Sequence, residues 1–149
     1  MFYLNKGKKI LNILLETLLL IKKLIKSEIE RRESSKKDKL LKNTGFYTIK
    51  SFEDFNFNEL TLPVEVIPEY LKNLEFIVSK TNLVMYGNME TGKTFLSIAL
   101  GVTACKKGIE VRFFRTSALV NKLAKAKKNG ALSEFIKQIS KAQLLICDG

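Results

Sequence analysis

The 149-residue chain contains no histidine, and only two cysteines and two prolines. The absence of histidine excludes Ser-His-Asp triads, other histidine-based acid–base catalysis and most zinc sites. Cys105 and Cys147 are far apart and show no CxxC spacing. We therefore expect two buried, reduced thiols in a cytoplasmic protein, with no disulfide and no cysteine metal site.

The sequence also lacks a hydrophobic run long enough to span a bilayer comfortably. The leucine-rich stretch 10–21 is interrupted by Asn12, Glu16 and Thr17, and no small-residue cleavage site follows it. We predict no stable membrane insertion. A helix that lies on a membrane surface through its leucines and lysines is the alternative for this stretch.

Acidic residues are few: 15 Asp and Glu stand against 26 Lys and Arg, which gives a formal net charge of +11. Residues 1–50 and 81–149 are both basic, whereas residues 51–80 are acidic. This pattern favours a polyanionic partner such as DNA or ATP, and the alternative is a lysine-rich solvated surface. We predict three parts: a basic helical arm (1–45), an acidic and aromatic connector (46–80) and a partial nucleotide-binding domain (81–149).

The arm carries apolar residues at helical spacing, which are Leu11, Leu14, Leu18, Ile21, Ile25 and Ile29. We expect one helix that Ser34 and Ser35 interrupt and that ends at Asn43-Thr44-Gly45. Its basic second half is predicted to contact DNA phosphates without sequence preference, with a solvated helical face as the alternative.

The connector reads as an irregular segment packed by its phenylalanines, punctuated by Pro63 and Pro68, with one short helix over 69–79. After it, strands and helices alternate. We predict strands at 82–87, 110–115 and 143–149. We predict helices at 92–108, at 117–130 with Ser117 as N-cap, and around Leu132–Ile139. This order predicts an α/β fold with a parallel sheet covered on both faces.

The stretch GNMETGKT, residues 87–94, fits the phosphate-loop pattern GxxxxGK[ST] at every fixed position. Glycine lets backbone N–H groups approach phosphate oxygens, and the helix that starts there presents its positive dipole end to the anion. Lys93 is expected to contact the β- and γ-phosphates of ATP, and the Thr94 hydroxyl to ligate Mg²⁺. The predicted nucleotide-binding residues are Gly87, Asn88, Met89, Glu90, Thr91, Gly92, Lys93, Thr94 and Phe95.

The stretch LLICD places Asp148 at the end of a buried strand, which is the pattern of a second, acidic nucleotide motif. We predict that this carboxylate holds Mg²⁺ beside Thr94, through water. Hydrolytic enzymes of this type usually place another acid directly after it, to orient the attacking water. Gly149 stands there instead, and the expected loss of rate is on the order of 10²–10⁴. We therefore predict no catalytic residue.

The chain resembles the IstB-like, DnaC-related ATP-binding proteins, which are helper ATPases of insertion sequences. The resemblance covers roughly residues 28–149 and rests on SEIERRESSKKDKLLKNTGF, TIKSFEDFNF, GNMETGKT, KKGIEVRFF and ALVNKLAKAKKNGALSEFIKQISKAQLLICD. It implies an AAA+-like P-loop NTPase fold that binds ATP and Mg²⁺, self-associates on DNA and serves a transposase or helicase. Lys93, Thr94 and Asp148 occupy the family's motif positions.

Members of that family continue beyond the position of Gly149 and carry further strands, sensor residues and a lid. The resemblance therefore implies a C-terminally truncated chain with an incomplete sheet. In such a sheet, strand 82–87 either pairs directly with strand 143–149 or leaves an open slot beside Val84. Two functions follow: an ATP-binding helper protein of DNA transposition, or a non-hydrolysing remnant with residual nucleotide and DNA binding.

Overall fold

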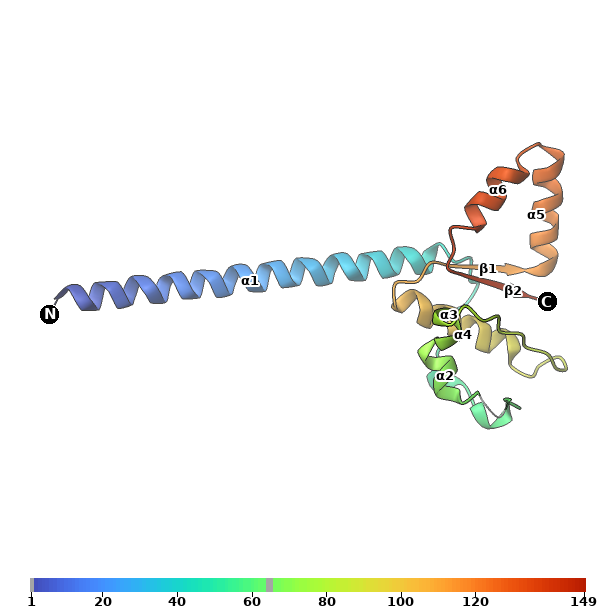
Figure 1. Ribbon diagram of the computed structural model, residues 1–149, viewed down its shortest axis with the longest axis horizontal. Helices are drawn as coiled ribbons and strands as arrows, with labels where there is room; N and C mark the ends of the chain where they lie inside the picture. The colour runs from blue at the N-terminus through green and yellow to red at the C-terminus, as the bar shows by residue number, and fades with distance from the viewer. Residues whose placement is uncertain (1, 64–65) are drawn as a thin grey trace. The chain divides into compact units, whose positions relative to one another are not determined.

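The computed structural model describes residues 2–63 and 66–149 and divides between Lys36 and Lys37 into two units. One helix, α1 (Phe2–Lys42), supplies the first unit and extends into the second (Figure 1). The predicted break at Ser34 and Ser35 is wrong, because both residues are helical. An exposed serine destabilises a helix by only about a few tenths of a kcal/mol relative to alanine. This cost is too small to end the helix. The predicted end is confirmed, since Gly45 has a φ of +88°.

Twelve apolar side chains of the first unit, between residues 10 and 29, are exposed. Each is between 47% and 62% exposed: Ile10, Leu11, Ile13, Leu14, Leu15, Leu18, Leu19, Leu20, Ile21, Leu24, Ile25 and Ile29. Within the described residues, none of the helices combines the length and the hydropathy that a bilayer crossing needs.

The connector is irregular, as predicted, and its phenylalanines pack on one another. Two short 3₁₀ helices, η1 (Phe52–Asp54) and η2 (Phe57–Glu59), lie within it. The ring of Phe57 lies 5.8 Å from that of Phe52 and 5.0 Å from that of Phe55. The single helix predicted over 69–79 is instead two, α2 (Pro68–Asn73) and α3 (Glu75–Val78). Leu74 separates them with a φ of +63°, a conformation that its complete burial explains.

A parallel two-stranded sheet forms the centre of the second unit, which confirms an incomplete α/β fold. Strand β1 (Val111–Arg115) pairs with β2 (Leu144–Asp148), with Val111 opposite Leu144 and Arg115 opposite Asp148. Helices α5 (Thr116–Lys128) and α6 (Leu132–Ile139) connect the strands. Ser117 is not the N-cap, because α5 already starts at Thr116 and Arg115 occupies the cap position without a side-chain bond.

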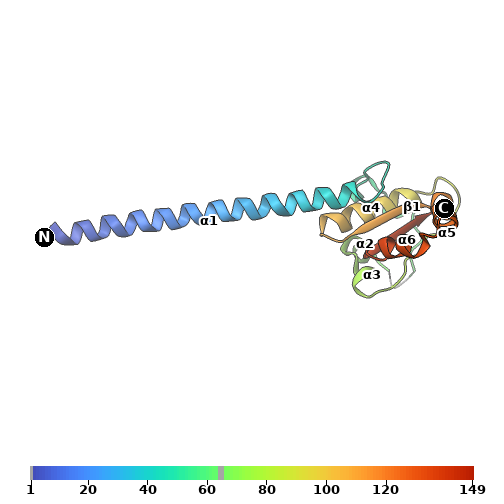
Figure 2. The same cartoon turned by 90° about the horizontal axis from the view of Figure 1, so that it is seen from above.

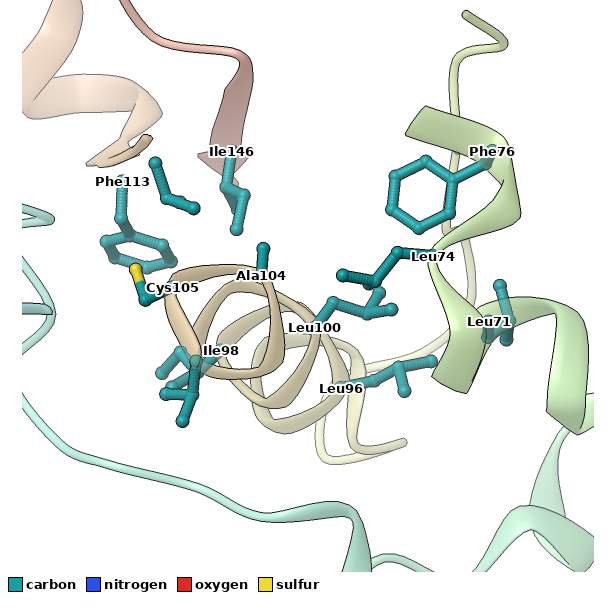
Figure 3. Packing of buried hydrophobic residues seen from close by; sticks show 12 residues of the cluster. Leu71, Leu74, Phe76, Leu96, Ile98, Leu100, Ala104, Cys105, Phe113 and Ile146 are labelled. Carbon is teal, nitrogen blue, oxygen red and sulfur yellow. The ribbon is translucent and has the colours of Figure 1, made fainter. Parts of the chain in front are cut away.

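The core forms around α4 (Lys93–Lys106), which has nine buried residues. Figure 3 shows Phe113 and Ile146 of the sheet on one side of this helix and Leu71, Leu74 and Phe76 on another. Gly101 lets the sheet approach closely, since a Cβ there would lie 2.9 Å from Ile146 Cδ1 and still closer to the Phe46 ring. The core therefore fixes α4 against β2.

The two faces of the sheet are covered unequally. Helix α4 packs against one face, where Val111, Phe113 and Ile146 are buried. Helices α5 and α6 lie on the other side of the strands (Figures 1 and 2), and neither has a buried residue among those described. Cys105 is buried, as predicted, but the prediction for Cys147 is wrong, because it points away from α4 and is exposed.

The predicted strand 82–87 is not a strand in the structure. Leu83 and Met85 pack against the core, while Val84 and Tyr86 are 80% and 94% exposed, so the side chains alternate as in a strand. No ladder joins this segment to β2, and the sheet that the structure describes has two strands. A cleft of about 630 Å³ separates the two segments. The open slot predicted beside Val84 is thus confirmed.

Candidate functional site

The loop 87–92 leads directly into α4, and Gly92 is the residue before the first turn of the helix. Gly92 has a φ of +79°, and a Cβ at this position would lie 3.0 Å from the Phe55 ring. Glycine is required on both counts, because L side chains rarely adopt this φ and the ring leaves little room. Since α4 is 14 residues long, its unpaired N–H groups and dipole give this end a partial positive charge.

The Lys93 side chain turns back into the loop. Its ammonium donates to Gly87 O at 2.9 Å, to Asn88 O, and to Thr91 Oγ1 at 3.2 Å. Thr91 in turn donates to Asn88 O at 2.9 Å. Three loop oxygens thus hold the charge of Lys93 at the centre of the loop, next to the start of α4.

Thr94 and Asp148 meet across the second unit. The Thr94 hydroxyl donates to Asp148 Oδ1 at 2.7 Å, although the two residues are 54 positions apart in the chain. Two features bring them together: the first turn of α4 carries Thr94, and the last residue of β2 carries Asp148. This short bond joins a hydroxyl and a carboxylate, and both are hard oxygen ligands.

Thr116 also supports Asp148, and no sequence pattern indicates this role. At the start of α5, its hydroxyl donates to the backbone carbonyl of Asp148 at 3.1 Å. Arg115 lies opposite Asp148 in the strand register. The backbone at the end of β2 is therefore held by both β1 and the start of α5, while the carboxylate itself is held by Thr94.

The other predicted loop residues are placed differently from one another. Met89 is 91% exposed, and Asn88 and Glu90 are exposed as well. Phe95 turns toward the connector, where its ring lies 5.5 Å from that of Phe55 and 4.9 Å from the Lys50 ammonium. The side chain of Phe95 thus anchors the connector to α4.

The 630 Å³ cleft opens beside this site. Lys93 and Ser97 of α4, the segment 80–85 and all of β2 line it, and Asp148 lies at its end. In the described part of the chain, no three acidic or cysteine side chains gather as a complete metal site. Thr94 and Asp148 can supply two oxygen ligands, which suits Mg²⁺, since this ion commonly takes one or two protein ligands and completes its shell with phosphate and water.

Comparison with known proteins identifies relatives over most of the chain. Residues 13–149 match the family model described as IstB-like ATP binding protein. A protein named as an ATP-binding protein of insertion sequence IS21 from Pseudomonas aeruginosa is 35% identical over 109 residues, 72% of this chain and 41% of the relative. One named for insertion sequence IS232 from Bacillus thuringiensis subsp. berliner is 30% identical over 127 residues, 85% of this chain and 50% of the relative.

A more distant match has a different name. The chromosomal replication initiator protein DnaA of Aquifex aeolicus is 30% identical over 129 residues, 86% of this chain and 31% of that protein. The chain thus spans about half the length, or less, of the curated relatives it matches. The two-stranded sheet with α4 after the loop is consistent with an incomplete P-loop NTPase-like fold.

Proposed function

Because the chain belongs to the family of IstB-like ATP binding proteins, we propose that it binds Mg-ATP at the loop 87–94. Lys93 and the N-terminus of α4 would bind the phosphates, and Thr94 and Asp148 would hold Mg²⁺. The observation that carries this proposal is the 2.7 Å bond between Thr94 and Asp148. It brings the two candidate metal ligands to the end of α4 where the loop holds Lys93.

The phosphate part of the proposal rests on charge at one end of one helix. The loop presents the ammonium of Lys93 and the N–H groups of the first turn of α4 on the same side of Gly92. Both favour an anion. The carbonyls of Gly87 and Asn88 accept from the ammonium. Phosphate oxygens would replace them with stronger, charge-assisted bonds.

The metal part rests on ligand type. Asp148 supplies a carboxylate and Thr94 a hydroxyl, and the bond between them shows that both reach one point. A magnesium ion bound there would replace the hydroxyl proton as the partner of the carboxylate, directly or through water. It would supply charge neutralisation for the β- and γ-phosphates.

The biological role that we propose is that of a helper protein of DNA transposition, which self-associates and serves a transposase or a helicase in the cytoplasm. Its DNA contact would be the basic half of α1, where nine Lys and Arg stand against four Asp and Glu in residues 22–42. Glu28 accepts from Arg31 at 2.8 Å and from Arg32 at 2.7 Å. The lysines of the arm are therefore its main phosphate contacts.

A second candidate function is nucleotide binding without turnover. Gly149 offers no carboxylate next to Asp148, so nothing at this position orients a water for attack on the γ-phosphate. Phosphate release at the background rate with intact ATP affinity supports this candidate. Release well above background would exclude it.

The test of nucleotide binding is thermal stabilisation by ATP with and without Mg²⁺. At a free ATP concentration 100 times the dissociation constant, stabilisation amounts to about 2.7 kcal/mol. We expect Lys93→Ala to remove the shift and Asp148→Asn to remove only the part that depends on Mg²⁺. Lys106→Ala, at the other end of the same helix, is the matched control. An unchanged shift in Lys93→Ala, or no shift in the wild type at any Mg²⁺ concentration, would refute the proposal.

A further inference from the structure

Glu90 has an unusual backbone conformation within the loop 87–92. Its φ is +68°, in the left-handed region that glycine adopts far more readily than a residue with a side chain. Met89 and Glu90 form a turn, and the Thr91 hydroxyl closes this turn by donating to Asn88 O at 2.9 Å. Such a conformation persists only where the surrounding contacts determine it. The loop therefore holds Glu90 in a defined place.

Lys93 holds the residues on both sides of Glu90. Its ammonium donates to Asn88 O and to Thr91 Oγ1, the second bond being 3.2 Å long. Consecutive Cα atoms are 3.8 Å apart, so the Cα atoms of Glu90 and Lys93 are separated by at most about 11 Å. Glu90 thus belongs to the same small turn that surrounds the charge of Lys93.

The carboxylate of Glu90 has no ion pair. The three oxygens that bind the Lys93 ammonium all come from other loop residues. Across the part of the chain that the structure describes, no lysine or arginine lies within ion-pair distance of Glu90, which is exposed. An unpaired negative charge therefore stands beside the site that we propose for phosphate. It opposes Lys93 and the N-terminus of α4, which both favour an anion.

The repulsion between this carboxylate and a bound nucleotide grows in proportion to the charge of the nucleotide. Because Mg²⁺ neutralises about two of the roughly four negative charges of ATP, metal-free ATP is repelled about twice as strongly as Mg-ATP. For a carboxylate about 10 Å from the phosphates, in water at low salt, the two forms differ roughly threefold in affinity.

We propose that Glu90 is a specificity-determining residue, whose unpaired carboxylate makes the loop select Mg-ATP over metal-free ATP. This inference rests on the proposed nucleotide site and deepens it. Glu90 acts by repulsion on the metal-free form, whereas Thr94 and Asp148 act by attraction on the metal. The two contributions are separable, because the repulsion weakens with salt and needs no contact with Mg²⁺.

The experiment is isothermal titration calorimetry of the full chain with ATP at low salt, once with excess Mg²⁺ and once with a chelator. Glu90→Gln removes the charge and keeps the size of the side chain. We expect it to tighten binding of metal-free ATP roughly eightfold and of Mg-ATP roughly threefold, so the ratio of the two dissociation constants falls about threefold. Glu90→Gly is expected to lower the ratio equally, since glycine suits the φ of this position.

Glu134→Gln is the matched control. It changes the net charge of the chain by the same amount, but Glu134 is an exposed residue of α6 and does not line the cleft beside the loop. We expect its ratio to equal that of the wild type. An equal fall in Glu134→Gln would assign the effect to net charge and overturn the role of Glu90.

The remaining outcomes separate this inference from the proposed function. Intact ATP binding with an unchanged ratio in Glu90→Gln would overturn the selectivity and leave the nucleotide site standing. A fall in Glu90→Gly without one in Glu90→Gln would assign the effect to loop conformation and overturn the role of the charge. Absence of ATP binding in the wild type and in every variant would refute the nucleotide site, and this inference with it.

Discussion

Gly101 is the position where the structure makes the sharpest prediction about stability. It lies in the middle of α4, where alanine is favoured over glycine by about 1 kcal/mol through helix propensity alone. Packing opposes this gain. An added Cβ would lie 2.9 Å from Ile146 Cδ1 and closer still to the Phe46 ring. Ile146 is buried, and Phe46 is partly buried against the core.

Overpacking of a core costs about 1–3 kcal/mol, so the steric cost exceeds the propensity gain. We expect Gly101→Ala to destabilise the second unit by about 1 kcal/mol, which corresponds to a few degrees in Tm. Gly101→Val adds more volume and loses helix propensity, so we expect it to cost about 3 kcal/mol or more. Both substitutions also push α4 away from β2, and thus Thr94 away from Asp148.

The assay is urea unfolding followed by near-ultraviolet circular dichroism, which reports tertiary packing rather than the helix content of α1. Gly7→Ala is the control, because a Cβ at Gly7 has no neighbour within 4 Å. If Gly101→Ala stabilises the protein by about 1 kcal/mol, as propensity alone predicts, the close approach of the sheet to α4 is not as the structure has it.

Two further predictions concern titrating groups. Burial raises the pKa of the Cys105 thiol to about 11 from 9.0, so between pH 9 and 11 the unfolded chain loses a proton that the folded chain keeps, and stability falls by at most about 2–3 kcal/mol. Cys105→Ala should flatten this part of the pH–stability curve, and a curve identical to the wild type would contradict the burial. The bonds from Arg31 and then Arg32 lower the pKa of Glu28 to about 2, so Glu28 stays charged at neutral pH. We expect Glu28→Gln to tighten non-specific DNA binding and to steepen its salt dependence by about 1 in slope, measured by anisotropy, with Glu134→Gln as control; equal slopes would exclude α1 as the contact.

The loop and its companion acid were predictable because local chemistry determines them. GNMETGKT predicts a helix that starts after Gly92, and LLICD predicts a strand that ends in an acid. The strand is present, but only Ile146 of it is buried. The parallel alternation of strands and helices then brings Thr94 and Asp148 to the same edge, as the 2.7 Å bond confirms. The roles of these residues toward nucleotide and metal stay predictions.

What the sequence could not give depends on contacts distant in the chain. The alternation in 82–87 predicts a strand, but a ladder needs a neighbour, and β2 does not reach this segment across the cleft. Leu74 reads as helical until its burial beside α4 is known. Two further contacts also join residues that are distant in the chain, so no local sequence pattern predicts them. They are the hydrogen bond from Thr116 to Asp148 and the ring contact between Phe55 and Phe95.

The separation of Thr94 from Asp148 by 54 positions has a consequence for synthesis. On the ribosome, the loop and α4 emerge before β1, α5, α6 and β2. The candidate phosphate-binding residues of the pocket are therefore made before Asp148. Magnesium nucleotide therefore cannot act as an early template for folding. Thr94 and Asp148, the two candidate Mg²⁺ ligands, come together only after β2 has been made and has paired with β1.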